Sequence, residues 1–206
     1  MKILIASRNA HKIREIRDIF RLPGVEWISA AEWGDLPDVE EDGDTFEANA
    51  IQKARELALA TGLWALADDS GLEVAALGGA PGVLSARYAG EPCDYARNNI
   101  KLLRELSGQT DRAARFRCVV ALCDPAGRTE MVTGQCPGRI IDAPRGTGGF
   151  GYDPVFVPDG YEATFAEMTN EQKNGLSHRG RALAQAKEKW APLLATAPSC
   201  FAGVSP

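Results

Sequence analysis

The sequence is poor in the residues that build metal cages and disulfide frameworks. It contains only two histidines, and its five cysteines are an odd number with no CxxC spacing among them. Zinc cages and disulfide-stapled folds rely on regularly spaced cysteine and histidine pairs, so neither is expected here. We therefore predict that the cysteines are structural thiols.

Long apolar runs are also missing. The longest are LWALA at 63–67 and CVVALC at 118–123, whereas a membrane helix needs about 20 apolar residues. The N-terminus has no apolar segment of the kind found in signal peptides. These absences predict a soluble, cytoplasmic protein without a membrane partner.

Basic charge is not in excess. The chain of 206 residues has 23 Lys+Arg against 28 Asp+Glu, a formal net charge of −5. Proteins that bind nucleic acid broadly need a basic surface, so no nucleic-acid partner is expected. With 45% hydrophobic and 25% charged residues, the composition is that of an ordinary globular protein. The length suits one domain, or two lobes that share a core.

The hydrophobic pattern alternates between strand-like and helix-like segments. We expect strands at 2–6, 25–29, 63–67, 115–123, 128–135 and 154–157, with the turn DPAG joining the fourth and fifth into a hairpin. Helices are expected at 10–20, from a capping box at Asp44 and Glu47 to Gly62, at 94–106, and from Ser177 to about Leu194. This pattern predicts one α/β domain with a mixed sheet over 1–195, in which two lobes could border a cleft, and a loose tail over 196–206.

The segment SRNAHK at 7–12 joins the first predicted strand to the first helix. Backbone N–H groups and the helix dipole favour an anion at such a position. The cations His11, Lys12, Arg14 and Arg17 lie in the first turns, against the usual dipole preference. They indicate either a negatively charged ligand or a solvated basic face.

The acidic run DVEEDGD at 38–44 superficially resembles the start of a calcium loop. It departs from that pattern at Glu40, in the third position, and at Asn49, where a bidentate Glu is expected in the twelfth. A solvated acidic loop is one interpretation. The other is that one of its carboxylates holds Mg²⁺, which takes one or two protein carboxylates together with substrate phosphates.

ADDSG at 67–71 places Asp68 and Asp69 at the predicted end of a strand, where α/β sheets often build their sites. Two adjacent carboxylates repel each other unless a cation, a proton or solvent intervenes, which favours a metal ligand or a general base. A turn stabilised by Asp and Gly is the alternative. Ser70 has no GxSxG elbow around it, so a serine hydrolase is not indicated.

GTGGFG at 146–151 matches GxGxxG but lacks the context of a dinucleotide site, because Tyr152-Asp153-Pro154 does not allow an immediate helix. We interpret it as a flexible loop that presents Phe150, Tyr152 and Asp153. An aromatic ring on such a loop could stack on a base, or it could pack in the core.

His178 and Arg179 follow the predicted cap Ser177, so two cations again lie at a positive helix end. This arrangement suggests donors directed at an oxygen-rich ligand. A structural role for the histidine is the alternative.

Six ordered blocks together resemble the inosine triphosphate pyrophosphatase family. They are SRNAHK at 7–12, EDGDTFEANAIQKA at 41–54, ADDSGLEV at 67–74, GGAPGVLSARYAG at 78–90, GGFGYDPVF at 148–156 and EQKNGLSHRGRAL at 171–183. The resemblance implies an elongated mixed sheet flanked by helices, with two lobes around a central active-site cleft. It also implies a homodimer that uses Mg²⁺ to hydrolyse ITP, dITP and XTP between the α and β phosphates, which removes deaminated purines from the nucleotide pool.

The resemblance assigns roles to particular residues. Its phosphate loop falls on Ser7, Arg8, Asn9, Ala10, His11 and Lys12, and its second phosphate-binding lysine on Lys53, which we expect early in a helix. The metal carboxylates fall on Glu41 and Asp69; Asp69 is also the implied general base, and Asp68 is the alternative. Substrate contacts fall on Ser70, Phe150, Gly151, Tyr152, Asp153, Lys173, His178 and Arg179. Many relatives have Gly where this chain has Arg8, and Gly permits a closer backbone approach.

Two alternatives to this activity exist. A non-catalytic nucleotide sensor could use the same pocket, but binding an anion alone does not require Glu41, Asp68 and Asp69. A septum-inhibitor-type nucleotide pyrophosphatase of related fold is the other, and the SHR block at 177–179 argues against it.

Overall fold

The structure is a computed structural model that describes residues 1–196. The chain divides into two compact units. The first comprises 1–68, 119–132 and the segment from 182 onward, and the second comprises 69–118 and 133–181. The single domain over 1–195 stays a prediction. Of the tail predicted to be loose, Thr196 ends the last helix, and the rest lies outside the described residues.

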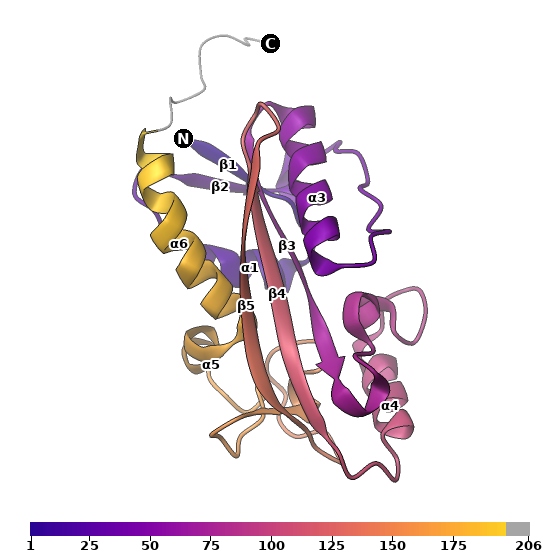
Figure 1. Cartoon of the computed structure of the whole chain (residues 1–206). Coiled ribbons are helices and arrows are strands. Elements are labelled where there is room, and N and C mark those ends of the chain that lie inside the picture. The colour runs from indigo at the N-terminus through magenta and orange to yellow at the C-terminus, as the bar shows by residue number, and fades with distance from the viewer. Residues whose placement is uncertain (197–206) are drawn as a thin grey trace. The chain divides into compact units, whose positions relative to one another are not determined.

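A six-stranded sheet has the order β2-β1-β3-β4-β5-β6. Its strands are β1 (Lys2–Ile5), β2 (Glu26–Ser29), β3 (Trp64–Val74), β4 (Ala113–Cys123), β5 (Thr129–Ile140) and β6 (Phe156–Pro158). β1 pairs in parallel with β2 and β3, whereas β5 pairs antiparallel with β6. The predicted mixed sheet is confirmed, and Figure 1 shows the long β4–β5 hairpin. The turn closes where Gly127 N–H donates to the Asp124 carbonyl at 3.0 Å.

The helices are α1 (Ala10–Ile19), α2 (Ala30–Trp33), α3 (Phe46–Thr61), α4 (Tyr95–Glu105), α5 (Asn170–Leu176) and α6 (His178–Thr196). Three short 3₁₀ segments are η1 (Ala75–Leu77), η2 (Gly82–Arg87) and η3 (Asp153–Val155). The sequence pattern missed α2 and α5, which are too short to show helical periodicity. Both begin with a capping box, at Ser29/Glu32 and Thr169/Gln172, which was the available signal.

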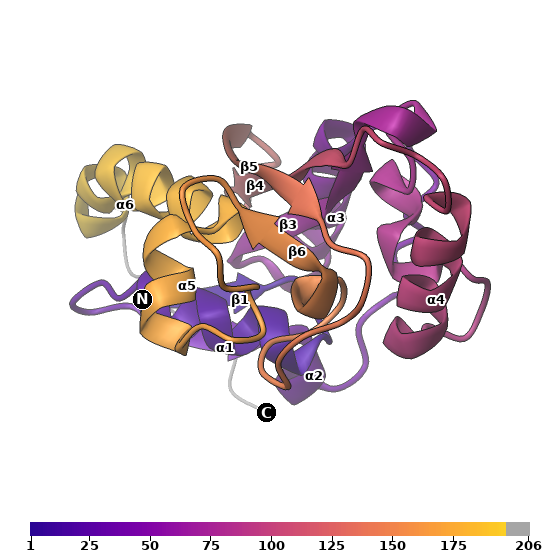
Figure 2. The ribbon, with the colours of Figure 1, turned by 90° about the horizontal axis from the view of Figure 1, so that it is seen from below.

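In the first unit, α3 covers one face of the sheet, and α1 and α6 cover the other (Figures 1 and 2). Ala50, Ala54 and Leu57 of α3 are buried, as the pattern predicted. The predicted cap at Asp44 is wrong, because Thr45 is the N-cap and its hydroxyl accepts the Ala48 N–H at 3.1 Å. The hydroxyl satisfies one of the unpaired N–H groups that begin every helix.

β3 is longer than predicted. The strand continues from Asp68 to Val74, so the expectation that Asp68 and Asp69 stand at its end is wrong. Leu72 and Val74 are fully buried in the core of the second unit. Their burial extends the strand through Asp, Ser and Gly, because tertiary packing overrides weak local β-propensity. Asp68 and Asp69 therefore lie within a regular β-strand.

The second unit has its own apolar core. It combines Leu72 and Val74 with residues of α4 and its C-cap, of β4, of β5 and of the segment after β5, namely Leu102, Leu106, Ala114, Phe116, Cys136, Ile140, Tyr152, Val155, Phe156 and Phe165. Phe116 and Phe156 meet edge to face with ring centroids 4.7 Å apart, a favoured aromatic geometry. This core fixes the backbone around 150–156.

The described cysteines are free thiols: Cys118, Cys123 and Cys136 are buried, and Cys93 is exposed. The buried three fit the predicted structural role, whereas the exposure of Cys93 does not. Cys200 lies outside the described residues. Within residues 1–196, no helix is long and apolar enough to cross a membrane.

Candidate active site

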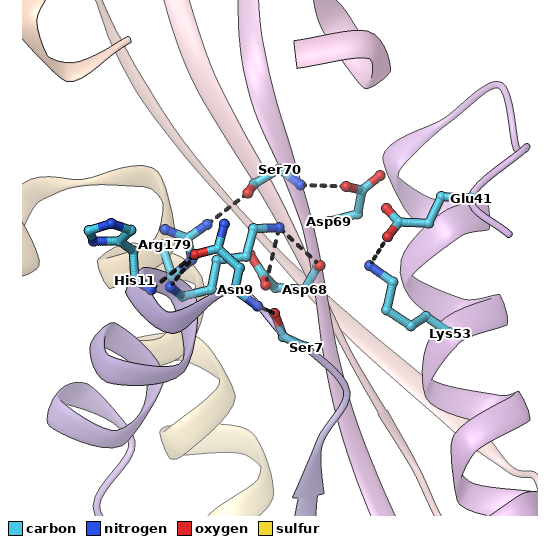
Figure 3. A network of polar contacts seen from close by, with 10 residues as sticks. Ser7, Asn9, His11, Glu41, Lys53, Asp68, Asp69, Ser70 and Arg179 are labelled. Carbon is cyan, nitrogen blue, oxygen red and sulfur yellow. Dashed lines mark hydrogen bonds and ion pairs between the residues drawn. The ribbon is translucent and has the colours of Figure 1, made fainter. Parts of the chain in front are cut away.

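The loop between β1 and α1 is a hydrogen-bonded helix cap (Figure 3). Asn9 is the N-cap of α1, and its Oδ1 accepts the backbone N–H groups of His11 at 3.0 Å and Lys12 at 3.3 Å. The Asn9 N–H donates to Ser7 Oγ at 3.2 Å. The first turn of α1, which starts at Ala10, contains no acidic residue. The positive end of the helix and the cations beside it therefore suit an anion.

Arg8 fits this loop without backbone strain. No non-glycine residue within 1–196 has a positive φ, so the conformation at this position does not require glycine. The Arg8 guanidinium forms an ion pair with Asp38 and donates to the Leu36 carbonyl at 3.2 Å. The Arg8 side chain therefore anchors the start of the acidic loop at 38–44.

Lys12 and Asp68 are paired within the first unit. Lys12 Nζ lies 3.4 Å from both the carbonyl oxygen and Oδ1 of Asp68. The Lys12 side chain is 16% exposed, and that of Asp68 is fully buried. A buried carboxylate needs such a partner because desolvation makes an isolated charge costly. Asp68 thereby holds Lys12 beside the N-terminal turn of α1.

The acidic loop places Glu41 against Lys53. Glu41 Oε1 is 2.5 Å from Lys53 Nζ, and Lys53 is buried in the middle of α3, not early in the helix as predicted. The loop is anchored where Gly43 N–H donates to Asn49 Oδ1 at 2.8 Å. A Cβ at Gly43 would lie 2.6 Å from that oxygen, so only glycine allows this approach. The loop therefore presents Glu41 at a fixed place on α3.

In the second unit, Asp69 and Ser70 are linked to Arg179. Ser70 N–H donates to Asp69 Oδ1 at 2.9 Å, and Arg179 donates to Ser70 Oγ at 2.8 Å. Arg179 is 1% exposed, and Asp69 is 6% exposed. Figure 3 shows the three side chains in sequence along these bonds. The strand that carries Asp69 is thus joined to the first turn of α6.

The glycine loop, Gly146–Gly151, is organised by Asp153 and Lys173. Asp153 Oδ2 accepts Phe150 N–H at 2.8 Å and Lys173 Nζ at 2.6 Å. A Cβ at Gly149 would lie 2.0 Å from the same oxygen, and its φ is +68°, so glycine is required there. Lys173 Nζ lies 4.8 Å from the centroid of the Phe150 ring, within cation–π range. The Arg179 guanidinium lies 5.7 Å from the centroid of the same ring. Four residues predicted for the base pocket, Phe150, Asp153, Lys173 and Arg179, therefore form one cluster.

His178 begins α6 directly after Ser177. The predicted cap is confirmed, because Ser177 Oγ accepts a backbone N–H of the first turn at 3.1 Å. The His178 ring stacks on Phe116 with centroids 4.6 Å apart and planes inclined by 9°, and the residue is 5% exposed. His178 is thus held in one orientation by the aromatic core.

Tyr152 is mainly an anchor. It is 3% exposed, and its hydroxyl donates to the Ser85 carbonyl at 2.9 Å. Burial raises the pKa of this phenol well above its usual range. Tyr152 therefore stays neutral and fixes the segment that follows Gly151.

Two residues of α4 that the sequence reasoning missed also contact the glycine loop. Asn99 Nδ2 donates to the Gly151 carbonyl at 2.9 Å. The Tyr95 ring lies 5.9 Å from the ring of Phe150. Their spacing, one helical turn apart on one face, was visible in the sequence. Nothing in the sequence indicated what that face would meet.

The candidate metal ligands are carboxylates. Among the described residues, no group of three or more His, Cys, Asp or Glu side chains is placed to hold a metal ion. Glu41 is partly exposed, with 36% of its side chain accessible, and Asp69 lies among polar groups. Both offer the hard oxygen atoms that Mg²⁺ prefers, and Mg²⁺ commonly takes one or two such ligands plus substrate phosphates. Each carboxylate, taken by itself, therefore fits the ligand type of a magnesium ion that arrives with a nucleotide.

These features define a class of protein. Taken by itself, the cationic helix start of the first unit suits an anion, and the buried donors around an aromatic ring of the second unit suit a planar polar group. The chain belongs to the Ham1 family, whose model matches residues 3–189.

Similar proteins agree with this assignment. A relative from Desulforamulus reducens, described as a dITP/XTP pyrophosphatase, is 51% identical over 91% of this chain and 94% of its own length. The structure of a HAM1 protein from Coxiella burnetii has a TM-score of 0.85 and 42% identity, covering 96% of this chain and 100% of that one. A nucleoside-triphosphatase / dITP/XTP pyrophosphatase from Mycobacterium abscessus has a TM-score of 0.75 and 47% identity, covering 90% and 98%. The family resemblance and the α/β fold are thereby confirmed.

Proposed function

We propose that this chain hydrolyses non-standard purine nucleoside triphosphates, namely ITP, dITP and XTP, to the nucleoside monophosphate and pyrophosphate. Water adds to the α-phosphorus, the bond from that phosphorus to the α–β bridging oxygen breaks, and pyrophosphate leaves. The family membership and the dITP/XTP pyrophosphatase activity for which the relatives are named support this assignment. We place the activity in the cytoplasm, in a homodimer, where it removes deaminated purines from the nucleotide pool.

The observation that carries the proposal is the buried donor cluster around Phe150. Lys173 and Arg179 are 3% and 1% exposed, yet both keep their cationic heads near this ring. Hypoxanthine and xanthine have a carbonyl oxygen at C6, which accepts hydrogen bonds, whereas adenine has an amino donor there. A carbonyl oxygen at C6 can accept a hydrogen bond from these cationic N–H groups, whereas the adenine amino group would set a donor against them, which is unfavourable. The cluster therefore favours 6-oxopurines over adenine.

Guanine shares the C6 oxygen, so its rejection requires another feature. Its exocyclic 2-amino group would have to clash with the pocket or lose hydration there. Phe150 contributes affinity by stacking, which is tolerant of base identity. Selectivity among purines therefore belongs to the polar side chains His178 and Arg179.

We assign the phosphates to the first unit's cations. Lys12, Lys53 and the N–H groups at the start of α1 neutralise the triphosphate. Glu41 and Asp69 supply carboxylate oxygens to Mg²⁺, which when bound would balance phosphate charge and polarise the reacting group. Asp69 takes the proton of the attacking water.

The test is a panel of ITP, dITP, XTP, ATP and GTP assayed with Mg²⁺ or with EDTA, scoring pyrophosphate against orthophosphate. We expect pyrophosphate, no turnover in EDTA, and a kcat/KM for ITP, dITP and XTP at least about 10²-fold above that for ATP and GTP. Arg179→Ala should shrink the ITP/ATP ratio, whereas Phe150→Ala should lower activity on all purines alike. Equal use of ATP and ITP by the wild type would refute the base-reading role, and binding without turnover would indicate a sensor.

A further inference from the structure

The glycine loop, defined as Gly146–Gly151, is attached to the protein by several hydrogen bonds of its backbone, of which three hold its second half from outside. Gly148 N–H donates to the Ala166 carbonyl at 3.0 Å, and Phe150 N–H donates to Asp153 Oδ2 at 2.8 Å. The carbonyl of Gly151 accepts from Asn99 Nδ2 at 2.9 Å. The first two bonds come from the chain segment that continues from the loop. The third comes from α4, which is 52 residues away in sequence.

Asn99 is an unfavourable choice for packing alone. It is 8% exposed, and its Oδ1 is buried without a hydrogen-bond partner among residues 1–196. A buried acceptor that has lost water and found no donor destabilises the folded state. Leucine has nearly the same size and would avoid that cost. The presence of an amide at this position is therefore explained by the hydrogen bond from Asn99 Nδ2 to the Gly151 carbonyl.

This bond acts on a stretch of backbone that is rich in glycine. Gly149 and Gly151 both have positive φ, +68° and +63°, and glycine restricts its neighbours little. Phe150 lies between them, and its ring meets Tyr95 at 5.9 Å with the planes inclined by 52°. Tyr95 and Asn99 are one turn apart on α4. The helix thus contacts both the ring and the peptide that follows it.

We propose that Asn99 is a positioning residue for the purine base: it fixes the Gly151 peptide, and through it the orientation of the Phe150 ring, before the nucleotide binds. A loop that is already ordered does not lose conformational entropy on binding, so affinity rises without new ligand contacts. The inference rests on the proposed function, because it assigns the base to Phe150. It predicts a defect in binding and in loop order with little change in the chemical step.

The test is Asn99→Leu, matched with Asn98→Leu one residue away on the same helix. Asn98 uses both ends of its amide, accepting Ala89 N–H at 2.7 Å and donating to the Ala86 carbonyl at 3.0 Å. We expect Asn99→Leu to keep or raise the urea midpoint of unfolding. It should accelerate amide hydrogen exchange at 148–151 and raise the Kd for an ITP analogue with a non-hydrolysable α–β bridge by about fivefold to tenfold, the scale of one hydrogen bond. Its kcat at saturating ITP should change less than twofold.

Asn98→Leu should give the opposite pattern, with a lower urea midpoint and unchanged exchange at 148–151. A second variant, Asn99→Asp, keeps the shape but replaces the donor by an oxygen that faces the Gly151 carbonyl. It should raise loop exchange and Kd at least as much as Asn99→Leu. Recovery of wild-type values in Asn99→Asp would contradict the role of the donor.

Two results overturn the inference. One is wild-type exchange and Kd in Asn99→Leu. The other is a lowered midpoint with faster exchange throughout the second unit, which is the behaviour of a merely structural residue. Loop exchange is measured without nucleotide, so this readout is independent of the activity. If the wild type fails to bind the ITP analogue, the proposed function fails, while the exchange comparison still decides whether Asn99 orders the loop.

Discussion

The buried ion pair between Lys173 and Asp153 permits a quantitative prediction. The side chains are 4% and 3% exposed, and Lys173 Nζ lies 2.6 Å from Asp153 Oδ2. Lys173→Met keeps most of the aliphatic stem but removes the cation, so the Asp153 carboxylate stays buried beside the Phe150 N–H without its charged partner. Removing one member of a buried pair typically costs 3–5 kcal/mol. We therefore expect the free energy of unfolding to fall by about 3–5 kcal/mol, a large part of the 5–15 kcal/mol typical of a domain.

The double variant Asp153→Asn/Lys173→Met separates the charge from the packing. The amide oxygen at position 153 can still accept the Phe150 N–H, and no net charge remains buried at the pair. We expect the double variant to be more stable than Lys173→Met alone by at least about 1.5 kcal/mol, because its uncompensated charge is gone.

The assay is urea unfolding followed by tryptophan fluorescence and circular dichroism, with Lys189→Met as the matched control. Lys189 pairs with Glu130 at 2.8 Å, but these side chains are 49% and 52% exposed. An exposed pair contributes at most about 1 kcal/mol, so the control should lose little. Equal losses in Lys173→Met and Lys189→Met would refute the argument from burial.

Three further predictions concern catalysis, phosphate binding and pH. Asp69→Asn should lower kcat by about 10²-fold or more, the scale of losing a positioned general base; near wild-type turnover would favour Asp68 as the base. Alanine at Lys12 or Lys53 should weaken triphosphate binding by about 1.5–3 kcal/mol in calorimetry, and unchanged affinity in both variants would place the phosphates elsewhere. Burial raises the pKa of Cys136 from 9.0 to about 11, so the unfolded chain loses this proton first and stability should fall as pH rises from about 9 to about 11, by up to about 3 kcal/mol. Cys136→Ala should flatten that part of the pH profile, and an unaltered slope would show that other groups cause it.

The sequence by itself determined the features that depend on neighbouring residues. The apolar periodicity identified α1, α3 and α4, the Asp124–Gly127 turn identified the β4–β5 hairpin, and Ser177 identified the start of α6. These signals lie within a few residues of the structure that they specify, because capping, turns and helical faces are local. The ordered motif blocks likewise led to the family.

Tertiary structure alone decided the features that join distant residues. β3 continues past Asp69 because Leu72 and Val74 pack in the core of the second unit. The local sequence pattern did not predict that core. Arg179 meets Ser70 across 109 residues, and Asn99 meets Gly151 across 52. Such pairs are set by how strands and helices fold back on one another, and no local propensity encodes them. The sequence therefore identified the residues of the candidate site, whereas the contacts, burial and orientation of their side chains follow from tertiary packing.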